Sequence, residues 1–267
     1  AILEALKILK TFKPNVVIGV GGYASSAMLY AASRKEIPAL IQEQNSFPGI
    51  TNKRLAGKVK KICVAYDGME KFFPAEKLAQ TGNPVRQEIA SQPDNKSLAY
   101  KHFQLDQGKF TVLVIGGSLG ALSINQSVLK NLKKLHENGI QLVWQTGVGF
   151  IKKKKKAMTD AGLPGIHAYA FIKEMHLAYA VADLVVSRAG AIAVSELCIV
   201  GKPAILIPYP HAAEDHQTHN AMALVNQNAA VLIKDQNAQS QLGDTILSLY
   251  ADEQKRTSLA QNVSKMA

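Results

Sequence analysis

The sequence contains few cysteines, few aromatic residues and no long apolar run. Cys63 and Cys198 are its two cysteines, and each lies in an apolar stretch where an unpaired, buried thiol is expected. This content excludes a small disulfide-stapled fold and fits a reducing compartment. No apolar run reaches the roughly 18 residues that span a bilayer, and the opening AILEALKILK predicts an amphipathic helix rather than a signal peptide.

Acidic residues are scarce relative to basic ones. The chain carries 31 Lys and Arg against 20 Asp and Glu, for a formal net charge of +11. Such a protein commonly meets nucleic acid, an anionic membrane or phosphorylated metabolites. Aromatic residues are only 6% of the chain and are not interleaved with Lys and Arg, so we expect no nucleic-acid partner. The lysine run at 152–156 predicts a solvated loop or helix start.

The chain reads as strands alternating with helices, which predicts an α/β fold with parallel sheets covered on both faces. A helix is expected at 25–33. Strands are expected at 16–20, 38–42, 61–65, 77–81, 111–115, 141–145, 166–170, 184–186, 204–207 and 230–233.

The passage NPVRQEIASQPDNKS, from residue 83, is polar and contains proline, as is typical of a domain junction. We therefore expect two Rossmann-like domains, residues 1–83 and 84–267. Parallel sheets bind ligands at the carboxyl ends of their strands, so the turns that carry Gly21, Gly117 and Gly190 should open toward one crevice.

Two strand-turn-helix segments, VLVIGGSLGA at 112–121 and VVSRAGAIAVSE at 185–196, indicate a diphosphate-bearing ligand. Each aims the N-terminus of a helix at a possible anion. The glycines do not spell G-x-G-x-x-G and could serve only the tight turn, and Ser118 either caps the helix or donates to a phosphate. Glu196 could accept from a ribose diol or be a solvated helix glutamate.

The segment HAAEDHQTHNA at 211–221 could hold a metal through His216 and His219, which are three residues apart. However, H-E-x-x-H is absent and no fourth ligand is evident. We favour a polar loop followed by a helix, with Gln217 and Asn220 as donors to a polar ligand, and we expect neither a metal nor another cofactor.

Six motifs together resemble the MurG family of bacterial peptidoglycan glycosyltransferases. The resemblance covers essentially the whole chain, and the motifs are GGYAS at 21–25, QEQNSFPGITNK at 42–53, GNPVR at 82–86, GGSLGA at 116–121, SRAGAIAVSE at 187–196 and HQTHNA at 216–221. It implies a GT-B fold of two Rossmann-like domains, the first incomplete. It also implies transfer of N-acetylglucosamine from UDP-N-acetylglucosamine to a lipid-linked muramyl-pentapeptide, at the cytoplasmic face of the membrane.

The same resemblance implies the site residues. Ile172 would present backbone groups to uracil, Glu196 would hold the ribose, and Arg86 would contact the nucleotide. Asn45 and Gln217 would contact the sugar. The diphosphate and sugar would face Ser118 and the helix start formed by Ala191, Ile192, Ala193, Val194 and Ser195.

The implied chemistry is inverting displacement at the anomeric carbon, with UDP as the leaving group. No D-x-D pair is present to carry a divalent metal. Helix N-termini and Arg86 are therefore expected to stabilise the leaving group, without a metal.

The family's Gly-rich loop ending in histidine has no counterpart here, so we expect an N-terminally truncated chain with no assignable catalytic base. Glu43 is the nearest carboxylate, although structural support of its loop is the preferred interpretation. Gln42 replaces a family histidine, which indicates that this position needs a polar group rather than a titrating one.

The basic residues of the first domain suit an anionic membrane surface, although solubilising lysines are the alternative. They are Arg34, Lys35, Lys53, Arg54, Lys58, Lys60 and Lys61. Two other functions stay open: a GT-B transferase for another nucleotide sugar, and a non-catalytic module that binds nucleotides or nucleic acid.

Overall fold

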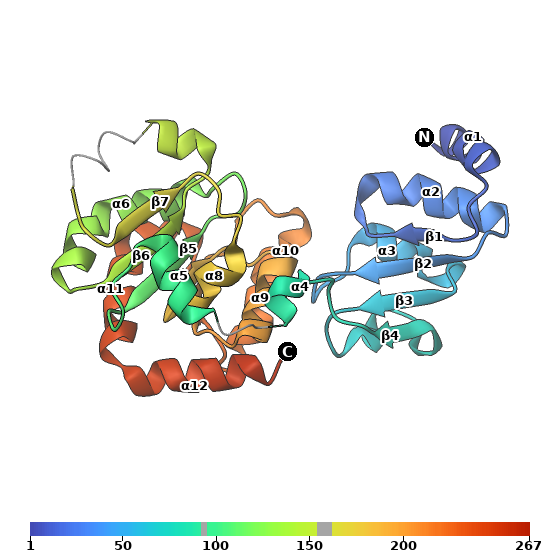
Figure 1. The fold of residues 1–267 in the computed structure, drawn as a ribbon. Helices are drawn as coiled ribbons and strands as arrows, with labels where there is room; N and C mark the ends of the chain where they lie inside the picture. The colour runs from blue at the N-terminus through green and yellow to red at the C-terminus, as the bar shows by residue number, and fades with distance from the viewer. Residues whose placement is uncertain (92–94, 154–161) are drawn as a thin grey trace. The chain divides into compact units, whose positions relative to one another are not determined.

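The computed structural model describes residues 1–91, 95–153 and 162–267 (Figure 1). Three lysines of the 152–156 run, at 154–156, lie outside the described residues. The chain forms two compact units, Ala1–Pro84 and Val85–Ala267, and each is described by itself.

Unit 1 is built on a four-stranded parallel sheet with the order β1-β2-β3-β4. Its strands are β1 (Val17–Gly19), β2 (Ala39–Glu43), β3 (Lys61–Val64) and β4 (Leu78–Gln80). Its helical segments are α1 (Ile2–Phe12), α2 (Gly22–Arg34), α3 (Ile50–Leu55), η1 (Ala56–Lys58), η2 (Met69–Lys71) and η3 (Ala75–Lys77).

One face of the unit 1 sheet is buried and the other is open. Leu9 of α1 and Leu29 of α2 join one core with Ile41 and Ile62 of the sheet. Side chains alternate between the faces of a strand, and Ile18, on the other face, is 59% exposed. The expectation that helices cover both faces is therefore wrong for unit 1, because α1, α2 and α3 pack together on the same side. For the same reason Cys63 is only half-buried, whereas Cys198 is buried as expected.

Unit 2 is built on a six-stranded parallel sheet with the order β10-β9-β8-β5-β6-β7. Its strands are β5 (Thr111–Ile115), β6 (Gln141–Gln145), β7 (Ile166–Tyr169), β8 (Leu184–Ser187), β9 (Ala204–Leu206) and β10 (Val231–Leu232). Its helical segments are α4 (Gln87–Ala90), α5 (Lys96–Phe103), α6 (Leu122–Glu137), α8 (Met175–Val181), α9 (Ala191–Val200), η4 (Ala213–Asp215), α10 (His216–Val225), η5 (Asp235–Asn237), α11 (Ala238–Ala251) and α12 (Glu253–Ser264).

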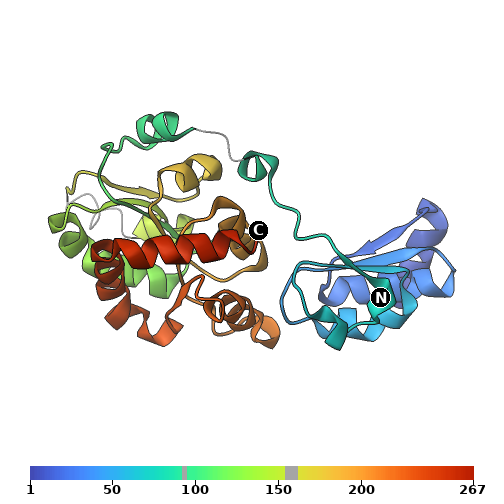
Figure 2. The ribbon, with the colours of Figure 1, turned by 90° about the horizontal axis from the view of Figure 1, so that it is seen from below.

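Helices cover both faces of the unit 2 sheet. Val114 of β5 and Trp144 of β6 share a core with Ile124 of α6 and Ile246 of α11. The alternate residues of the strands, such as Leu113, face the opposite side and are also fully buried. Helices α5 and α8 pair with each other away from α6 and α11, and α12 lies along the outside of the unit against α9 and α11 (Figure 2).

All ten expected strands are present. β5 and β6 have the predicted bounds, and most of the others differ by one residue at one or both ends. The largest shortening, by one residue at each end, is in β1, β4 and β10, which lie at sheet edges and pair on one side only. The helix expected at 25–33 is longer and spans Gly22–Arg34. No helix within the described ranges has the length and apolar character needed to cross a bilayer.

Candidate functional site

A cavity of about 740 Å³ lies at the carboxyl edge of the unit 2 sheet. Its walls come from the segments that follow β5, β8 and β9. The order of the sheet places β8 directly beside β5, which brings Gly117 and Gly190 to the same opening. A volume of this size is in the range that holds a metabolite as large as a nucleotide sugar.

The turn after β5 is shaped by Gly120, which has a φ of 78°. A Cβ at this position would lie 1.9 Å from the carbonyl oxygen of Thr146, so only glycine lets the turn pack against that backbone. Ser118 is exposed on the same turn and lines the cavity. The glycines therefore serve close packing, and that packing presents Ser118 to the opening.

Two helices begin at this cavity, and neither has a side-chain cap. The residue before α6 is Ala121 and the residue before α9 is Gly190, and no side chain hydrogen-bonds to the first N–H groups of either helix. Both residues line the cavity. Uncapped N–H groups together with the positive end of the helix dipole form a binding site for an anion.

The motif at the start of α9 contributes mainly backbone to the cavity. Gly190 and Ala193 line it, whereas the side chain of Val194 is buried in unit 2. Ala191 and Ile192 are half-buried at the helix start. The hydroxyl of Ser195 donates to the carbonyl of Ala191 at 3.1 Å, so it closes a turn of its own helix.

Arg188 is at the centre of a hydrogen-bond network on the cavity wall. Its guanidinium donates to Asp235 at 2.5 Å, to Ser123 at 3.1 Å and to the carbonyls of Ile207 and Pro208 at 3.0 and 3.1 Å. Ser123 also donates to Asp235 at 2.5 Å. Arg188 therefore ties the turn after β8 to the start of α6 and to the loop after β9. This role was not predictable from the residues around Arg188, because its partners lie 19 to 65 residues away along the chain.

Gln145, the last residue of β6, links two of the expected site segments. Its Nε2 donates to the carbonyl of Gly117 at 2.9 Å, and its Oε1 accepts the N–H of Ile172 at 2.8 Å. The N–H of Ile172 is thus engaged, which leaves its carbonyl for a ligand. Sequence reasoning missed Gln145, although a glutamine that ends the otherwise apolar LVW run is a detectable signal.

Glu196 is not a solvated helix glutamate, since it is only 5% exposed. Its Oε2 accepts the hydroxyl of Tyr179 at 2.9 Å, and its Oε1 accepts Arg86 Nη2 at 3.0 Å. Burial, followed by the charge of Glu196, raises the pKa of Tyr179 well above its ordinary value of 10.0. Tyr179 therefore stays protonated and donates to Glu196. The Arg86 side chain is 48% exposed, so it covers the carboxylate from the solvent side.

Gln217, at the start of α10, also lines the cavity. Its Oε1 accepts the N–H of Tyr209 at 3.0 Å, which turns its amide nitrogen into the group that can donate to a ligand. Asn220, the other expected donor, is fully buried and donates to the carbonyl of Ala189 at 3.3 Å. Asn220 thus supports the turn before α9 and does not reach a ligand. Among the described residues, no three His, Cys, Asp or Glu side chains are grouped to hold a metal, and this includes His216 and His219.

Glu43 organises a loop in unit 1 at the carboxyl end of β2. Its Oε1 accepts the N–H and the Nδ2 of Asn45 at 3.0 and 3.2 Å. Its Oε2 accepts the N–H of Gly49 at 3.1 Å and the Nδ2 of Asn52 at 2.7 Å. Gln42 Nε2 donates to Asn83 Oδ1 at 2.8 Å. Four donors saturate the Glu43 carboxylate, as in a group that supports a loop.

Comparison with protein families identifies both parts of the chain. Residues 1–64 match the glycosyltransferase family 28 N-terminal domain, and residues 111–267 match the glycosyltransferase family 28 C-terminal domain. A Bacteroides thetaiotaomicron protein is 49% identical over 266 residues, which are 99% of this chain and 72% of that protein. A Porphyromonas gingivalis protein is 50% identical and aligns with 98% of this chain and 70% of its own length. Both are named UDP-N-acetylglucosamine–N-acetylmuramyl-(pentapeptide) pyrophosphoryl-undecaprenol N-acetylglucosamine transferase.

Solved structures agree with this assignment. The crystal structure of Acinetobacter baumannii MurG matches all of this chain and 73% of its own, with a TM-score of 0.80 and 29% identity. A Staphylococcus aureus MnaA structure with UDP shares the fold at a TM-score of 0.70, with 14% identity over 98% of this chain and 74% of its own. The two parallel Rossmann-like sheets of this chain are those of the GT-B fold, as expected. The chain therefore belongs to glycosyltransferase family 28 and, within it, to the MurG family of N-acetylglucosamine transferases.

Proposed function

We propose that the carboxyl-edge cavity of unit 2 binds UDP-N-acetylglucosamine and that the protein transfers its sugar to the undecaprenyl-pyrophosphoryl-muramyl-pentapeptide of peptidoglycan synthesis. The observation that carries this proposal is the meeting of two uncapped helix N-termini in one cavity of a MurG family chain. Residues 1–83 would then be the acceptor and membrane side, and residues 84–267 the donor domain.

The hydrogen bonds of the site support an order of subsites. The diphosphate would lie over Ser118 and the start of α9, a helix that has no side-chain cap. Gln145 joins the Gly117 turn directly to Ile172, which would receive uracil through its carbonyl. Glu196 would accept the ribose hydroxyls once Arg86 leaves its Oε1, and the exposed guanidinium would then be close to the diphosphate. Gln217 and Asn45 would contact the sugar.

The reaction would be an inverting displacement. The acceptor hydroxyl forms a bond to the anomeric carbon as the bond to the UDP oxygen breaks. The hydroxyl proton passes to a general base, and we assign that role to no residue of this chain. The negative charge that develops on UDP needs oriented donors, and the α6 and α9 N-termini with Arg86 would supply them without a metal. Glu43 would act by holding Asn45 and the loop in place.

A membrane surface with anionic headgroups is the expected partner of unit 1, at the cytoplasmic face. Two of its basic residues lie beside aromatic rings: Lys53 Nζ is 4.6 Å from the centre of the Phe47 ring, and Lys58 Nζ is 5.6 Å from that of Tyr30. Lysines beside aromatic rings suit a membrane, whose anionic headgroups lie over apolar acyl chains. We expect the chain to sediment with phosphatidylglycerol vesicles at low salt and not with phosphatidylcholine vesicles. Equal sedimentation with both would contradict this partner.

Calorimetric titration with UDP-N-acetylglucosamine tests the donor site. Separate titrations with UDP-glucose and GDP-mannose test its selectivity. We expect selective binding that is unchanged by EDTA. Glu196→Gln should weaken binding about tenfold, because a charged acceptor of the ribose is lost. Glu253→Gln, at the exposed start of α12, is the matched control.

The other outcomes separate the alternative functions. Equal binding of UDP-glucose would indicate a transferase for another nucleotide sugar. Binding that EDTA abolishes would contradict metal independence. A folded chain that binds none of the nucleotides would overturn the donor-site assignment.

A further inference from the structure

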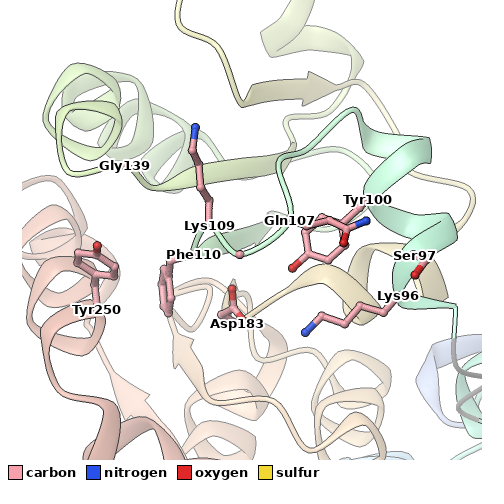
Figure 3. A pocket seen from close by; sticks show the side chains of 10 residues that line it. Lys96, Ser97, Tyr100, Gln107, Lys109, Phe110, Gly139, Asp183 and Tyr250 are labelled. Carbon is pink, nitrogen blue, oxygen red and sulfur yellow. The ribbon is translucent and has the colours of Figure 1, made fainter.

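A second cavity, of about 850 Å³, lies at the amino edge of the unit 2 sheet, opposite the proposed donor site. Its lining residues precede the strands: Phe110 comes before β5, Gly139 before β6 and Asp183 before β8. The rest of the wall comes from α5, from the loop at 107–109 and from Tyr250 near the end of α11 (Figure 3). A five-residue strand is about 17 Å long, so this cavity is separate from the carboxyl-edge site.

Hydrogen bonds hold the wall of this amino-edge cavity in place. The side chain of Gln141 accepts the N–H of Asp106 at 2.7 Å and donates to the Asp106 carbonyl at 2.9 Å. Asp183 Oδ2 accepts the N–H of Thr111 at 2.8 Å. The loop before β5 is thus fixed at both of its ends, and the cavity is formed before any ligand enters. A preformed cavity lowers the ordering cost of binding.

The cavity is lined by charged side chains of both signs. Two lysines, Lys96 and Lys109, line it beside a single carboxylate, that of Asp183. Lys109 pairs with Asp106 at 2.6 Å, whereas Lys96 extends over the cavity toward Asp183 (Figure 3). A third lysine, Lys202, is at the same edge before β9; burial lowers its pKa, and the charges of Asp183 and Lys96 act on it in opposite directions. Because Lys109 is paired with Asp106, Lys96 is the cation of the lining that an added anion would meet.

Aromatic rings form the apolar part of the cavity. The rings of Phe110 and Tyr250 meet edge to face, with their centres 5.1 Å apart. Arg256 stacks over Phe110 with its Cζ at 4.9 Å from the ring centre, and it donates to the Tyr250 carbonyl at 2.6 Å. On the side of α5, the ring of Tyr100 also lines the cavity (Figure 3). Flat apolar surfaces next to ammonium groups match a ligand with an anionic group on a flat body.

We propose that the amino-edge cavity binds a small metabolite that carries a phosphoryl or carboxylate group on an aromatic or apolar body. The anionic group lies against Lys96, and the apolar body packs on Phe110 and Tyr250. This site is independent of the proposed donor site, because the two occupy opposite edges of the sheet.

Phenyl phosphate is the probe, titrated into isotope-labelled protein and followed by amide NMR shifts in the presence of excess UDP. We expect saturable shifts at residues 96–100, 107–110 and 183. Inorganic phosphate carries only the anionic group and benzyl alcohol only the aromatic ring, so each should bind more weakly than phenyl phosphate. Lys96→Gln should weaken phenyl phosphate about fivefold. Lys101→Gln, on the exposed side of the same helix and outside the cavity lining, should leave the affinity unchanged.

Three results would overturn the proposal. The first is the absence of saturable shifts at the amino edge. The second is equal weakening by Lys96→Gln and Lys101→Gln, which would indicate only a general charge effect. The third is shifts confined to residues 116–123 and 187–191, which would place the probe in the donor cavity. These three results can be interpreted even if UDP does not bind, because the shifts at the amino-edge cavity and at the donor cavity are measured at different residues.

Discussion

Tyr179 and Glu196 form a hydrogen bond inside unit 2: the phenol donates to Glu196 Oε2 at 2.9 Å, and the two residues are 2% and 5% exposed. The tyrosine fixes one oxygen of the carboxylate and leaves the other to Arg86. A ligand that replaces Arg86 would therefore meet an acceptor whose orientation is already set. Glu196 thus depends on a residue 17 positions earlier in the chain.

This pair predicts a loss of stability at alkaline pH. The pKa of Tyr179 is raised well above 10.0 in the folded protein, chiefly by burial. Above pH 10 the unfolded chain loses the phenol proton while the folded chain keeps it, so stability falls as pH rises. The contribution should fall by about 1.4 kcal/mol per pH unit. Tyr179→Phe should remove it, as measured by urea unfolding from pH 8 to pH 11.

Tyr23→Phe is the control for this experiment, because Tyr23 is 93% exposed. Its alkaline stability should follow that of the unsubstituted protein. If Tyr179→Phe and Tyr23→Phe show the same pH profile, Tyr179 does not supply the effect.

Glu43→Gln should loosen the loop at residues 44–49. The glutamine presents an NH2 group to donors that now face a carboxylate, so at least one bond from Asn45, Gly49 or Asn52 is lost. We expect a destabilisation of about 1–3 kcal/mol and faster hydrogen exchange at the amides of Asn45 and Gly49. Unchanged exchange at both amides would show that the carboxylate does not hold the loop.

Arg188→Lys should destabilise unit 2 although it keeps the charge. Lysine cannot reproduce the fork that bonds Asp235, Ser123 and two carbonyls together. We expect a loss of about 2–4 kcal/mol, measured as a lower urea midpoint. Arg34→Lys, at an exposed position of α2, should leave the midpoint in place. A midpoint that is also unchanged for Arg188→Lys would exclude the network as a source of stability.

Gly120→Ala and Gly117→Ala form a matched pair in one turn. Both glycines have positive φ, 78° and 84°. The added Cβ at 120 would meet the Thr146 backbone, whereas at 117 it meets nothing within 4 Å. Gly117→Ala should cost only about 1–2 kcal/mol of backbone strain, and Gly120→Ala should cost more and distort the cavity. Thermal unfolding of both variants provides the comparison, and equal losses would contradict the close approach at Gly120.

The strands and the glycine turns were predictable because their signals are local. The apolar run TVLVI and the glycines that follow it are adjacent in the sequence, and β5 has the predicted bounds. The start of α9 at Ala191 was predictable for the same reason. The six motifs also predicted the family, because their combination and order are more specific than any one motif.

The roles of the polar side chains were harder to predict, since they depend on partners far along the chain. Gln145 joins Gly117 to Ile172, and Arg86 reaches Glu196 across 110 positions. Periodicity does not reveal such pairs. The open face of unit 1 also escaped prediction, because the side on which α1, α2 and α3 pack is decided by their contacts and not by the pattern of any one helix.

The sequence by itself determined the class of fold, the positions of nearly all its strands and turns, and the family, because each of these depends on patterns of neighbouring residues. Only the tertiary structure decided that β8 pairs with β5, which brings the Gly117 and Gly190 turns to one opening. It also decided that Arg188 stabilises the cavity wall and that Tyr179 orients Glu196. The physical reason is that hydrogen bonds between distant segments form only after the sheet has set the order of its strands.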